Sequence, residues 1–514
     1  MNTLLAQPFG TLPAMLAHHA VTRGEHPAVT QGAHAALVLD GQVLTYAQLH
    51  TRVQQVAGAL QRDGLRPGQA IAICAATSLA YVCTFLGAVQ AGVTVAPLPP
   101  TATPAQLQAL SANAGAVAVF VDADTAAHWA DAPVRRVLLD EPAWTNWLQG
   151  APQPEPVTRQ PQEPFNLIYS SGTTGMPKGI VQSCGMRWAQ LQRSPANGFG
   201  PEAVTLLAIP LYSNLTLTYL FGAIGLGGTV VLMGKFDAGR YLALAAQHRA
   251  THSVLVPVQF RRLMDHPDFE RTDLSTLRRR FCAGAPFVPE LKAEVLRRWP
   301  GELTEYYGLT EGGGRTELQA HLHPDKLHTV GRVSAGNDIR LIDEDGHELP
   351  PDAMGEIVGH SATMMNGYHG LPEATREAEW FDASGKRFIR TGDMGRFDAD
   401  GFLVLMDRRK DMLISGGLNV YPSDLEEVLR QHPQVADVAV VGVASQRWGE
   451  TPVAFVVPVA GAADSEDSLC AWANERLGKA QRLACVQFID TLPRSEVGKV
   501  LKRQLREQLQ RAVP

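Results

Sequence analysis

Residues 167–181 read Leu-Ile-Tyr-Ser-Ser-Gly-Thr-Thr-Gly-Met-Pro-Lys-Gly-Ile-Val, in which two apolar, strand-like runs flank a series of hydroxyl residues and glycines. Glycines let the backbone approach an anion closely, hydroxyls and amides donate to phosphate oxygens, and a lysine supplies charge. A hairpin loop without a ligand is the alternative, but a hairpin needs only one or two such residues. We therefore predict a phosphate-binding loop, whose candidate residues are Ser170, Ser171, Gly172, Thr173, Thr174, Gly175 and Lys178.

This loop is not the common nucleotide-binding pattern G-x-x-x-x-G-K-[ST]. Lys178 follows Pro177 and precedes Gly179, where that pattern requires Ser or Thr after the lysine. The sequence therefore indicates a different kind of phosphate loop.

Length and composition describe a protein of several domains without a strong charge bias. The 514 residues exceed what one hydrophobic core supports, so we expect two or more domains. A formal net charge of −6 argues against general binding to nucleic acid or to an anionic membrane. We see neither a signal-peptide pattern in residues 1–15 nor an uninterrupted apolar run of about 18 residues. The six cysteines form no C-x-x-C pair, which favours buried thiols in a reducing compartment, and we expect a cytoplasmic protein.

Apolar patterns before and after the loop alternate between strands and helices. Leu49, Val53, Val56 and Leu60 recur at helical spacing, and the run 70–75 that follows is strand-like. Such alternation predicts an α/β fold with a parallel sheet covered by helices. Residues 331–404 instead combine short strands with turns, which predicts a smaller, mostly β subdomain. From residue 411 a further compact α/β unit is expected, and Ser423-Asp-Leu-Glu426 predicts a capping box that opens its first helix at Asp424.

Six stretches together resemble the motifs of the adenylate-forming superfamily, in the order in which that superfamily has them. The resemblance covers nearly the whole chain and favours the acyl-CoA and aryl-CoA ligase branch. It implies a large N-terminal domain of layered α/β subdomains with a small β subdomain, residues 1–409, and a small mobile C-terminal domain, residues 410–514, with a hinge at Lys410. The stretches are Ser170–Gly179, Cys282–Pro286, Tyr307–Glu311, Arg390–Asp393, Asp407–Glu426 and Pro493–Lys499.

The resemblance also implies roles for residues that would bind Mg·ATP. Tyr307 would stack on adenine, with Gly284, Ala285 and Pro286 as the opposite wall. Thr310 would contact the α-phosphate, and Glu311 would help to hold Mg²⁺, which prefers carboxylate and phosphate oxygens. Asp393 would accept from both ribose hydroxyls, with Arg408 nearby. Taken singly these stretches have plainer explanations, because Gly-Ala-Pro and Gly-Asp are common in turns and an acid after a strand is common at a surface.

Further implied roles belong to the C-terminal residues. Lys499 would bridge the carboxylate and phosphate oxygens during adenylation, although most lysines in such a basic context are simply solvated. Ser415, Gly416 and Gly417 would line the tunnel for the pantetheine arm of coenzyme A, and a hairpin turn is the alternative. Trp448 would face the CoA side.

By the same resemblance, the acyl pocket is expected near Tyr212, Ser213, Asn214 and Tyr306. Tyr306 stands where long-chain ligases of the family often have glycine, and Asn214 aligns with a position that touches ring substituents in aryl-acid adenylating relatives. A phenol at 306 should close the far wall and favour a short or flat acid, since an aromatic ring is large and rigid. Asn214 could bond a polar group on the substrate. The alternative is that Tyr306 turns into the core and Asn214 only caps the following helix. Glu305 stands where many relatives have Asn or Gln, which puts the adenine amino contact in doubt.

These observations predict an ATP-dependent acid–thiol ligase that forms an acyl-adenylate, releases pyrophosphate, and passes the acyl group to coenzyme A with release of AMP. Its cofactors and partners would be ATP, Mg²⁺, CoA and a small carboxylic acid, aromatic or otherwise compact, with no nucleic acid or membrane; a homodimer is left open. The alternatives are a stand-alone adenylation enzyme that loads a carrier-protein thiol and a nucleotide-binding regulator without catalysis, with a luciferase-type oxygenase more distant.

Overall fold

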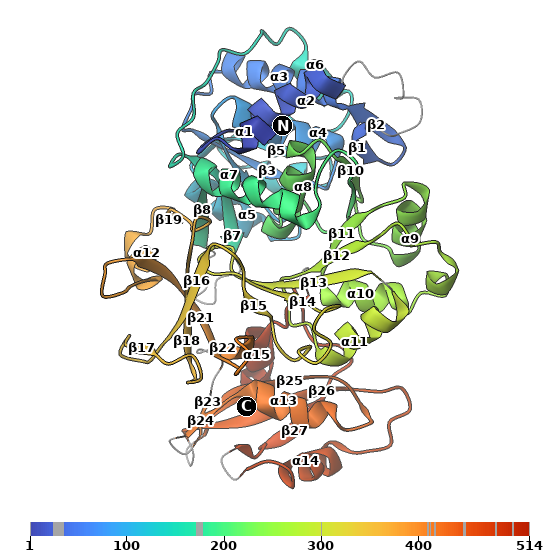
Figure 1. Ribbon diagram of the computed structural model, residues 1–514, viewed down its shortest axis with the longest axis vertical. Helices are drawn as coiled ribbons and strands as arrows, with labels where there is room; N and C mark the ends of the chain where they lie inside the picture. The colour runs from blue at the N-terminus through green and yellow to red at the C-terminus, as the bar shows by residue number, and fades with distance from the viewer. Residues whose placement is uncertain are drawn as a thin grey trace.

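The computed structural model describes residues 2–23, 35–170, 178–299, 301–408, 411, 413–415, 418–445, 449–478, 481–495 and 498–512. Strands in these ranges form four sheets, of which three belong to the part before residue 409 and one to the C-terminal part (Figure 1). The predicted α/β class, with a large N-terminal and a small C-terminal domain, is confirmed.

A nine-stranded sheet runs in the order β15-β14-β13-β12-β11-β9-β10-β1-β2. It is parallel from β13 to β1, as the alternation of strands and helices predicts, and antiparallel at both edges. Its strands are β1 Ala35–Leu39, β2 Gln42–Thr45, β9 Val204–Leu207, β10 Thr229–Leu232, β11 His252–Leu255, β12 Arg279–Cys282, β13 Glu302–Tyr307, β14 Thr316–Gln319 and β15 Arg332–Val333.

A seven-stranded sheet runs in the order β19-β8-β7-β4-β3-β5-β6. It is parallel from β7 to β6, while β8 lies antiparallel between β7 and β19. Its strands are β3 Ala70–Cys74, β4 Thr94–Pro97, β5 Ala116–Val121, β6 Arg135–Leu138, β7 Pro164–Ser170, β8 Lys178–Ser183 and β19 Gly367–Tyr368.

Helices cover both faces of these two sheets. The largest core contains residues of both sheets together with α2, α3, α4, α7 and α8, so these helices lie between the sheets. Helices α9, α10 and α11 cover the outer face of the nine-stranded sheet, and α5 covers that of the seven-stranded sheet. The helices before residue 300 are α1 Asn2–Leu5, α2 Leu12–Arg23, α3 Tyr46–Arg62, α4 Leu79–Gln90, α5 Pro104–Asn113, α6 Ala143–Leu148, α7 Cys184–Arg193, α8 Asn214–Gly225, α9 Ala238–Gln247, α10 Pro257–Met264 and α11 Pro289–Arg298.

The helical spacing of Leu49, Val53, Val56 and Leu60 explains α3, because all four side chains are buried in this core. A capping box between Thr45 and Gln48 satisfies the first turn of α3. Four of the six cysteines, Cys74, Cys83, Cys184 and Cys282, are buried as free thiols.

The predicted β subdomain is an antiparallel sheet with the order β17-β16-β18-β21-β20, and β22 pairs with β21. Its elements are β16 Asn337–Ile342, β17 Glu348–Leu349, β18 Gly355–Ser361, α12 Pro372–Glu377, β20 Glu379–Phe381, β21 Arg387–Phe397 and β22 Leu403–Arg408. In Figure 1 this sheet lies beside the nine-stranded sheet, below the seven-stranded one.

The C-terminal part is a sheet with the order β24-β23-β26-β25, to which β27 adds beside β26. Helices α13 and α14 pack on one face and α15 on the other. In Figure 1, α15 lies between this sheet and the rest of the molecule. The elements are β23 Leu413–Ser415, β24 Leu418–Val420, α13 Pro422–Arg430, β25 Val435–Ser445, β26 Gly449–Pro458, α14 Glu466–Asn474, β27 Cys485–Phe488 and α15 Lys502–Ala512.

The capping box predicted at Ser423 and Glu426 is wrong. Helix α13 begins at Pro422, with Tyr421 as its N-cap and no side-chain hydrogen bond from that cap. Proline suits the first helical position because its ring fixes φ and no N–H is lost there. Glu426 instead accepts from the backbone N–H of Val440 at 2.9 Å and pairs with Lys502 at 2.8 Å. It therefore ties α13 to β25 and α15 rather than to its own N-terminus.

Across the described ranges, no helix combines the length and apolar character needed to cross a membrane.

Candidate active site

Several candidate residues lie where parallel strands of the nine-stranded sheet end. Ser213 and Asn214 follow β9, Gly284 follows β12, and Tyr307 ends β13. Because parallel strands present their carboxyl ends at one edge, these segments lie together, as ligand sites in open α/β sheets do.

The glycine-rich loop connects two paired strands. Ser170 at the end of β7 lies directly opposite Lys178 at the start of β8. Residues 171–177 lie outside the described residues, and with them the predicted Ser171, Gly172, Thr173, Thr174 and Gly175; of Ser170 only the backbone is described. An antiparallel connection agrees with both the phosphate loop and the plain hairpin, so the phosphate role stays a prediction.

Side chains of β8, the strand that follows this loop, lie near the segment that carries Thr310 and Glu311. Lys178 Nζ lies 4.8 Å from the centre of the Tyr368 ring, and the Tyr368 hydroxyl donates to Glu311 Oε1 at 3.0 Å. Burial, and then the neighbouring Glu311 carboxylate, raise the pKa of Tyr368. Further along β8, Gln182 Nε2 donates to the Thr310 carbonyl at 3.0 Å. The structure thus brings the predicted lysine and the predicted magnesium ligand to the same tyrosine.

Sequence reasoning missed Tyr368 and Gln182. Tyr368 is 57 positions from Glu311 and Gln182 is 128 positions from Thr310. No local pattern marks either of them, because each acts through a contact made only after folding.

The turn after Glu311 depends on glycine. Gly312 has φ +76°, and a Cβ there would meet the Thr363 carbonyl oxygen at 1.7 Å. A side chain would push this turn away from the β subdomain. Met365 N–H also donates to the Glu311 carbonyl at 2.8 Å, which holds the acid in place from its backbone.

At the predicted ribose and adenine end, the Tyr307 hydroxyl donates to Asp393 Oδ2 at 2.8 Å. Asp393 is buried in β21, and its N–H donates to Thr391 Oγ1 at 3.0 Å. Arg408 lies opposite Asp393 in the pairing of β21 with β22, although its side chain is not among the described atoms. Three residues predicted to surround the nucleoside are therefore neighbours, and an acceptor-only carboxylate suits a cis-diol.

The Gly284-Ala285-Pro286 segment leaves open space beside its glycine. Gly284 has φ +91°, and a Cβ built there would have Leu215 and Val256 as its nearest neighbours, both at 4.0 Å. Gly284 and Pro286 are exposed. This geometry is that of a turn and also leaves room for a flat ligand, and it places the first turn of α8 next to the predicted adenine wall.

Tyr306, which is predicted to close the acyl pocket, packs on a group of aromatic side chains. Its ring stacks on Phe281 with centroids 6.0 Å apart, and Phe281 in turn contacts Tyr219 at 5.1 Å. The Tyr306 hydroxyl donates to Asn197 Oδ1 at 2.8 Å, and burial raises its pKa to about 12. The Arg315 guanidinium lies 4.4 Å from the ring centre. The phenol is therefore held in one orientation.

Asn214 does not cap α8. The N-cap is Ser213, which makes no side-chain cap bond, and Asn214 is the first helical residue. Asn214 Oδ1 accepts from Arg187 Nη2 at 3.0 Å. The Tyr212 hydroxyl is buried and has no hydrogen-bond partner among the described residues. Such a group is normally satisfied by water or a ligand, which fits a pocket that receives a polar substrate group.

Glu305 is an internal ion-pair partner. Its carboxylate pairs with Lys292 Nζ, and both side chains are buried, 6% and 2% exposed. Lys292 also donates to the carbonyls of Leu327 and Thr329 at 2.8 and 3.0 Å. Burial raises the pKa of Glu305, while Lys292 opposes that change. The Glu305 carboxylate therefore pairs with Lys292 of α11 inside the protein and is not available to an adenine base.

The turn that carries Lys499 reaches the N-terminal part of the chain. Ser495 N–H donates to the Lys499 carbonyl at 2.8 Å, and Lys499 N–H donates to Ser495 Oγ at 3.2 Å. A Cβ at Gly498 would lie 3.3 Å from Val258 Cγ1 at the start of α10. Since Val256, two residues before Val258, is next to the Gly284 position, the lysine-bearing turn lies on the side of the predicted adenine wall.

Other candidate residues cannot be placed. Lys410, Gly416, Gly417 and Trp448 lie outside the described residues, and of Ser415 only the backbone is described, at the end of β23. Their hinge and CoA roles stay predictions, as does the boundary at residue 410.

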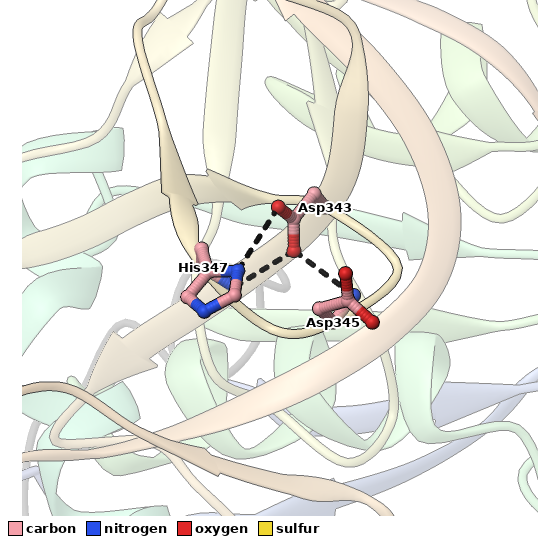
Figure 2. Close-up of side chains that lie close together, drawn as sticks. All are labelled: Asp343, Asp345 and His347. Atoms are coloured by element: carbon pink, nitrogen blue, oxygen red, sulfur yellow. Dashed lines mark hydrogen bonds and ion pairs between the residues drawn. The ribbon is translucent and has the colours of Figure 1, made fainter.

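A separate acidic group lies in the turn between β16 and β17 (Figure 2). Asp343, Asp345 and His347 approach one another there. Asp343 accepts from the backbone N–H groups of Asp345 and His347 at 2.9 and 2.8 Å and from His347 Nδ1 at 3.2 Å. These are the bonds of a tight turn, and they account for the group without a metal.

Comparison with known proteins places the chain in a family. It belongs to the AMP-binding enzyme family, which it matches over residues 17–369, and residues 424–499 match the AMP-binding enzyme C-terminal domain. The resemblance to the adenylate-forming superfamily and the prediction of an AMP-forming acid–thiol ligase that uses ATP and CoA are confirmed at the level of this class.

Among curated relatives, the chain is 33% identical to the feruloyl-CoA synthase of an Amycolatopsis species, over 91% of this chain and 94% of that one. It is 31% identical to the fatty acid–[acyl-carrier-protein] ligase ScoC of Streptomyces coeruleorubidus, over 92% and 93%. Among solved structures, ATP-bound MatB from Rhodopseudomonas palustris is similar, with a TM-score of 0.87, 27% identity, and coverage of 98% of this chain and all of that one.

Proposed function

We propose that this chain activates an aromatic or otherwise compact carboxylic acid and joins it to CoA. The acid's carboxylate oxygen attacks the α-phosphorus of ATP, the bond to pyrophosphate breaks, and an acyl-adenylate results. The CoA thiol then attacks the acyl carbon, and AMP leaves. The class of reaction follows from the family; the identity of the acid and the roles of individual residues are the proposal.

The single observation that carries the substrate proposal is the fixed position of Tyr306. Stacking on Phe281 and a hydrogen bond to Asn197 hold the phenol in one orientation. A long alkyl chain would require this ring to move, at the cost of that bond and of aromatic packing. The relatives named above include both an aromatic-acid and a fatty-acid enzyme, so their names do not decide between the two.

The proposed residue roles come from the resemblance to the family, and the contacts of the described residues support them. Thr310 would bind the α-phosphate, with the segment held by Gln182. Glu311 would hold Mg²⁺, since a carboxylate oxygen next to phosphates is the donor that this ion prefers. Bound Mg²⁺ would neutralise phosphate charge as pyrophosphate leaves. Tyr307 and Asp393 would bind the nucleoside, and Lys499 would stabilise charge on the carboxylate and α-phosphate. The phosphate loop, Gly284–Pro286 and Arg408 would complete the ATP site.

The C-terminal domain would then rotate about Lys410, and Ser415, Gly416, Gly417 and Trp448 would face CoA in that second state. A carrier-protein thiol is the second candidate acceptor, because one of the relatives is a ligase of that kind.

The test is an acid panel of benzoates, cinnamates and fatty acids, supplied with ATP and either CoA or a phosphopantetheinylated carrier protein, with AMP and pyrophosphate measured. We expect the highest kcat/KM for a benzoate or cinnamate with CoA. Tyr306→Gly should extend the accepted chain length. A wild-type preference for palmitate, or a Tyr306→Gly variant with an unchanged chain-length range, would overturn the substrate proposal.

A further inference from the structure

Arg187 is buried in α7 with every N–H donor of its guanidinium engaged. Its side chain lies between the two large sheets, and the residue is 6% exposed. All of its partners are neutral amide or hydroxyl oxygens. They are Asn166 Oδ1 for Nε at 3.0 Å, Gln190 Oε1 and Thr218 Oγ1 for Nη1 at 2.9 and 3.4 Å, and Gln182 Oε1 and Asn214 Oδ1 for Nη2 at 2.5 and 3.0 Å.

No carboxylate forms an ion pair with this arginine in the described part of the chain. The rings of Phe221 and Phe165 lie 5.3 and 5.9 Å from the guanidinium carbon and supply their negative faces. Burial lowers the pKa of Arg187 to about 9, so the group stays charged at neutral pH. Because its five donors are already bonded, Arg187 does not bind the substrate carboxylate itself.

The charge fixes the orientation of the amides around it. A guanidinium only donates, so each neighbouring amide must turn its oxygen toward Arg187 and its NH₂ group away. Gln182 follows this rule: its oxygen faces Arg187, and its nitrogen donates to the Thr310 carbonyl at 3.0 Å. Asn166 follows it too, since its nitrogen donates to Gln182 Oε1 at 3.1 Å.

Asn214, a residue of the predicted acyl pocket, must obey the same rule. Its oxygen is bonded to Arg187, so the group that remains for a ligand is the NH₂ donor. Asn214 is partly exposed, and the next residue, Leu215, faces the open space at Gly284.

We infer that Arg187 is a positioning residue that sets two features of the site at once. By orienting Gln182, Arg187 holds the Thr310 backbone. By orienting Asn214, it leaves the NH₂ group of that side chain as a hydrogen-bond donor for the substrate in the acyl pocket. The second feature deepens the proposed function, on which it rests: the preferred acids carry an acceptor such as an ether or carbonyl oxygen. An acid with an apolar group of the same size would leave the Asn214 N–H unsatisfied, and a pocket that loses such a bond discriminates strongly.

Three amide-to-acid exchanges around this arginine test the inference. Each of Asn214→Asp, Gln182→Glu and Gln190→Glu keeps the side-chain shape and gives Arg187 the same new counter-charge. A purely structural role predicts the same outcome for all three. The inference predicts three different ones, measured by pyrophosphate release with methoxy- and ethyl-substituted cinnamates, which are similar in size but differ in their acceptor.

Wild-type enzyme should favour the methoxy acid by about tenfold in kcat/KM, the scale of one hydrogen bond. Asn214→Asp replaces the donor by an acceptor, so this ratio should fall to one or below. Gln182→Glu places a carboxylate against the Thr310 carbonyl, so kcat for adenylation should fall by about tenfold or more for every acid while the ratio is kept. Gln190→Glu is the matched control and should keep both the wild-type methoxy-to-ethyl ratio and the wild-type kcat for adenylation. Thermal unfolding checks that all three variants fold.

A methoxy-to-ethyl ratio that is the same in Asn214→Asp as in wild type, or that changes equally in Gln190→Glu, would overturn the Asn214 part. Wild-type kcat in Gln182→Glu would overturn the Thr310 part. An enzyme that accepts fatty acids alone overturns the proposed substrate and the Asn214 part with it, whereas the Gln182 part is then judged on the accepted fatty acid.

Discussion

The Tyr307 hydroxyl donates a hydrogen bond to Asp393 Oδ2 at 2.8 Å, across the boundary between the nine-stranded sheet and the β subdomain. The ring that is expected to cover adenine is thus attached to the carboxylate that is expected to bind ribose. Neither residue can shift without affecting the other, so the geometry of the predicted nucleoside site depends on the relative position of the two sheets.

Tyr307→Phe keeps the ring and removes this bond. We expect KM for ATP to rise by about tenfold with a smaller change in kcat, because a bond to a carboxylate is worth about 1.5–3 kcal/mol when one partner is removed. Initial rates over a range of ATP concentrations measure this. The same change at the adjacent Tyr306 breaks a bond to Asn197 instead, so its effect should fall on KM for the acid. Equal effects of the two changes on KM for ATP would contradict the assignment.

Lys499→Ala should reduce acyl-adenylate formation on the order of a hundredfold or more, the scale for removing one preorganised charge stabiliser. Thioester formation from supplied acyl-AMP and CoA should survive. Lys502→Ala is the control, since Lys502 Nζ is 2.8 Å from Glu426 Oε1 and serves the C-terminal domain. Equal loss of both half-reactions in Lys499→Ala would show that the role is wrongly assigned.

Lys410→Pro tests the hinge. Proline fixes φ, so a residue that must change its backbone angles between two domain orientations can no longer do so. We expect adenylation to persist and CoA-dependent turnover to collapse, whereas Lys410→Ala should keep both because it leaves the backbone free. Separate assays of pyrophosphate release and thioester formation distinguish these results. Near-normal thioester formation in Lys410→Pro would remove residue 410 from the hinge.

Lys292→Met leaves Glu305 buried without its cation and two carbonyls without their donor. The free energy of unfolding should fall by about 3–5 kcal/mol at pH 8. Burial already raises the pKa of Glu305, so the folded state binds that proton more tightly than the unfolded state. Stability that depends on this group therefore decreases as pH rises above the ordinary glutamate value, and the loss should be smaller near pH 5.

Urea unfolding of wild type, Lys292→Met and the double variant Lys292→Met/Glu305→Leu at both pH values measures this effect. The double variant should regain part of the stability, since an apolar pair carries no buried charge. A loss in Lys292→Met that is independent of pH would contradict the explanation.

Much of the fold could be predicted because local apolar spacing records which face of an element is buried. The helix that contains Leu49, Val53, Val56 and Leu60 is the clearest case. The capping box predicted at Ser423 was wrong because the partners of Glu426 are distant in the sequence. Glu426 is bonded to Val440 and Lys502, which come close only in the folded domain, and Pro422 starts the helix without that box.

The same limit applies to the site. Motifs predicted Glu311, Tyr307 and Asp393 as site residues, because each lies in a short recognisable stretch. The arginine at position 187 has partners on several elements, and Tyr368 reaches Glu311 from β19, the edge strand of the seven-stranded sheet. A single sequence contains no local signal for such contacts.

Strand β8 has a consequence for how this chain can vary. Lys178 and Gln182 lie on the same side of the strand, because successive side chains alternate. Lys178 contacts the Tyr368 ring, and Gln182 donates to the Thr310 carbonyl. The two side chains are four residues apart, which is about 13 Å along a strand, and this spacing lets β8 make both contacts. Inserting or deleting one residue between them would turn one of the two side chains to the opposite face. Homologues that keep both contacts should therefore show no gaps in this interval, while α8 remains free to diverge with the acid.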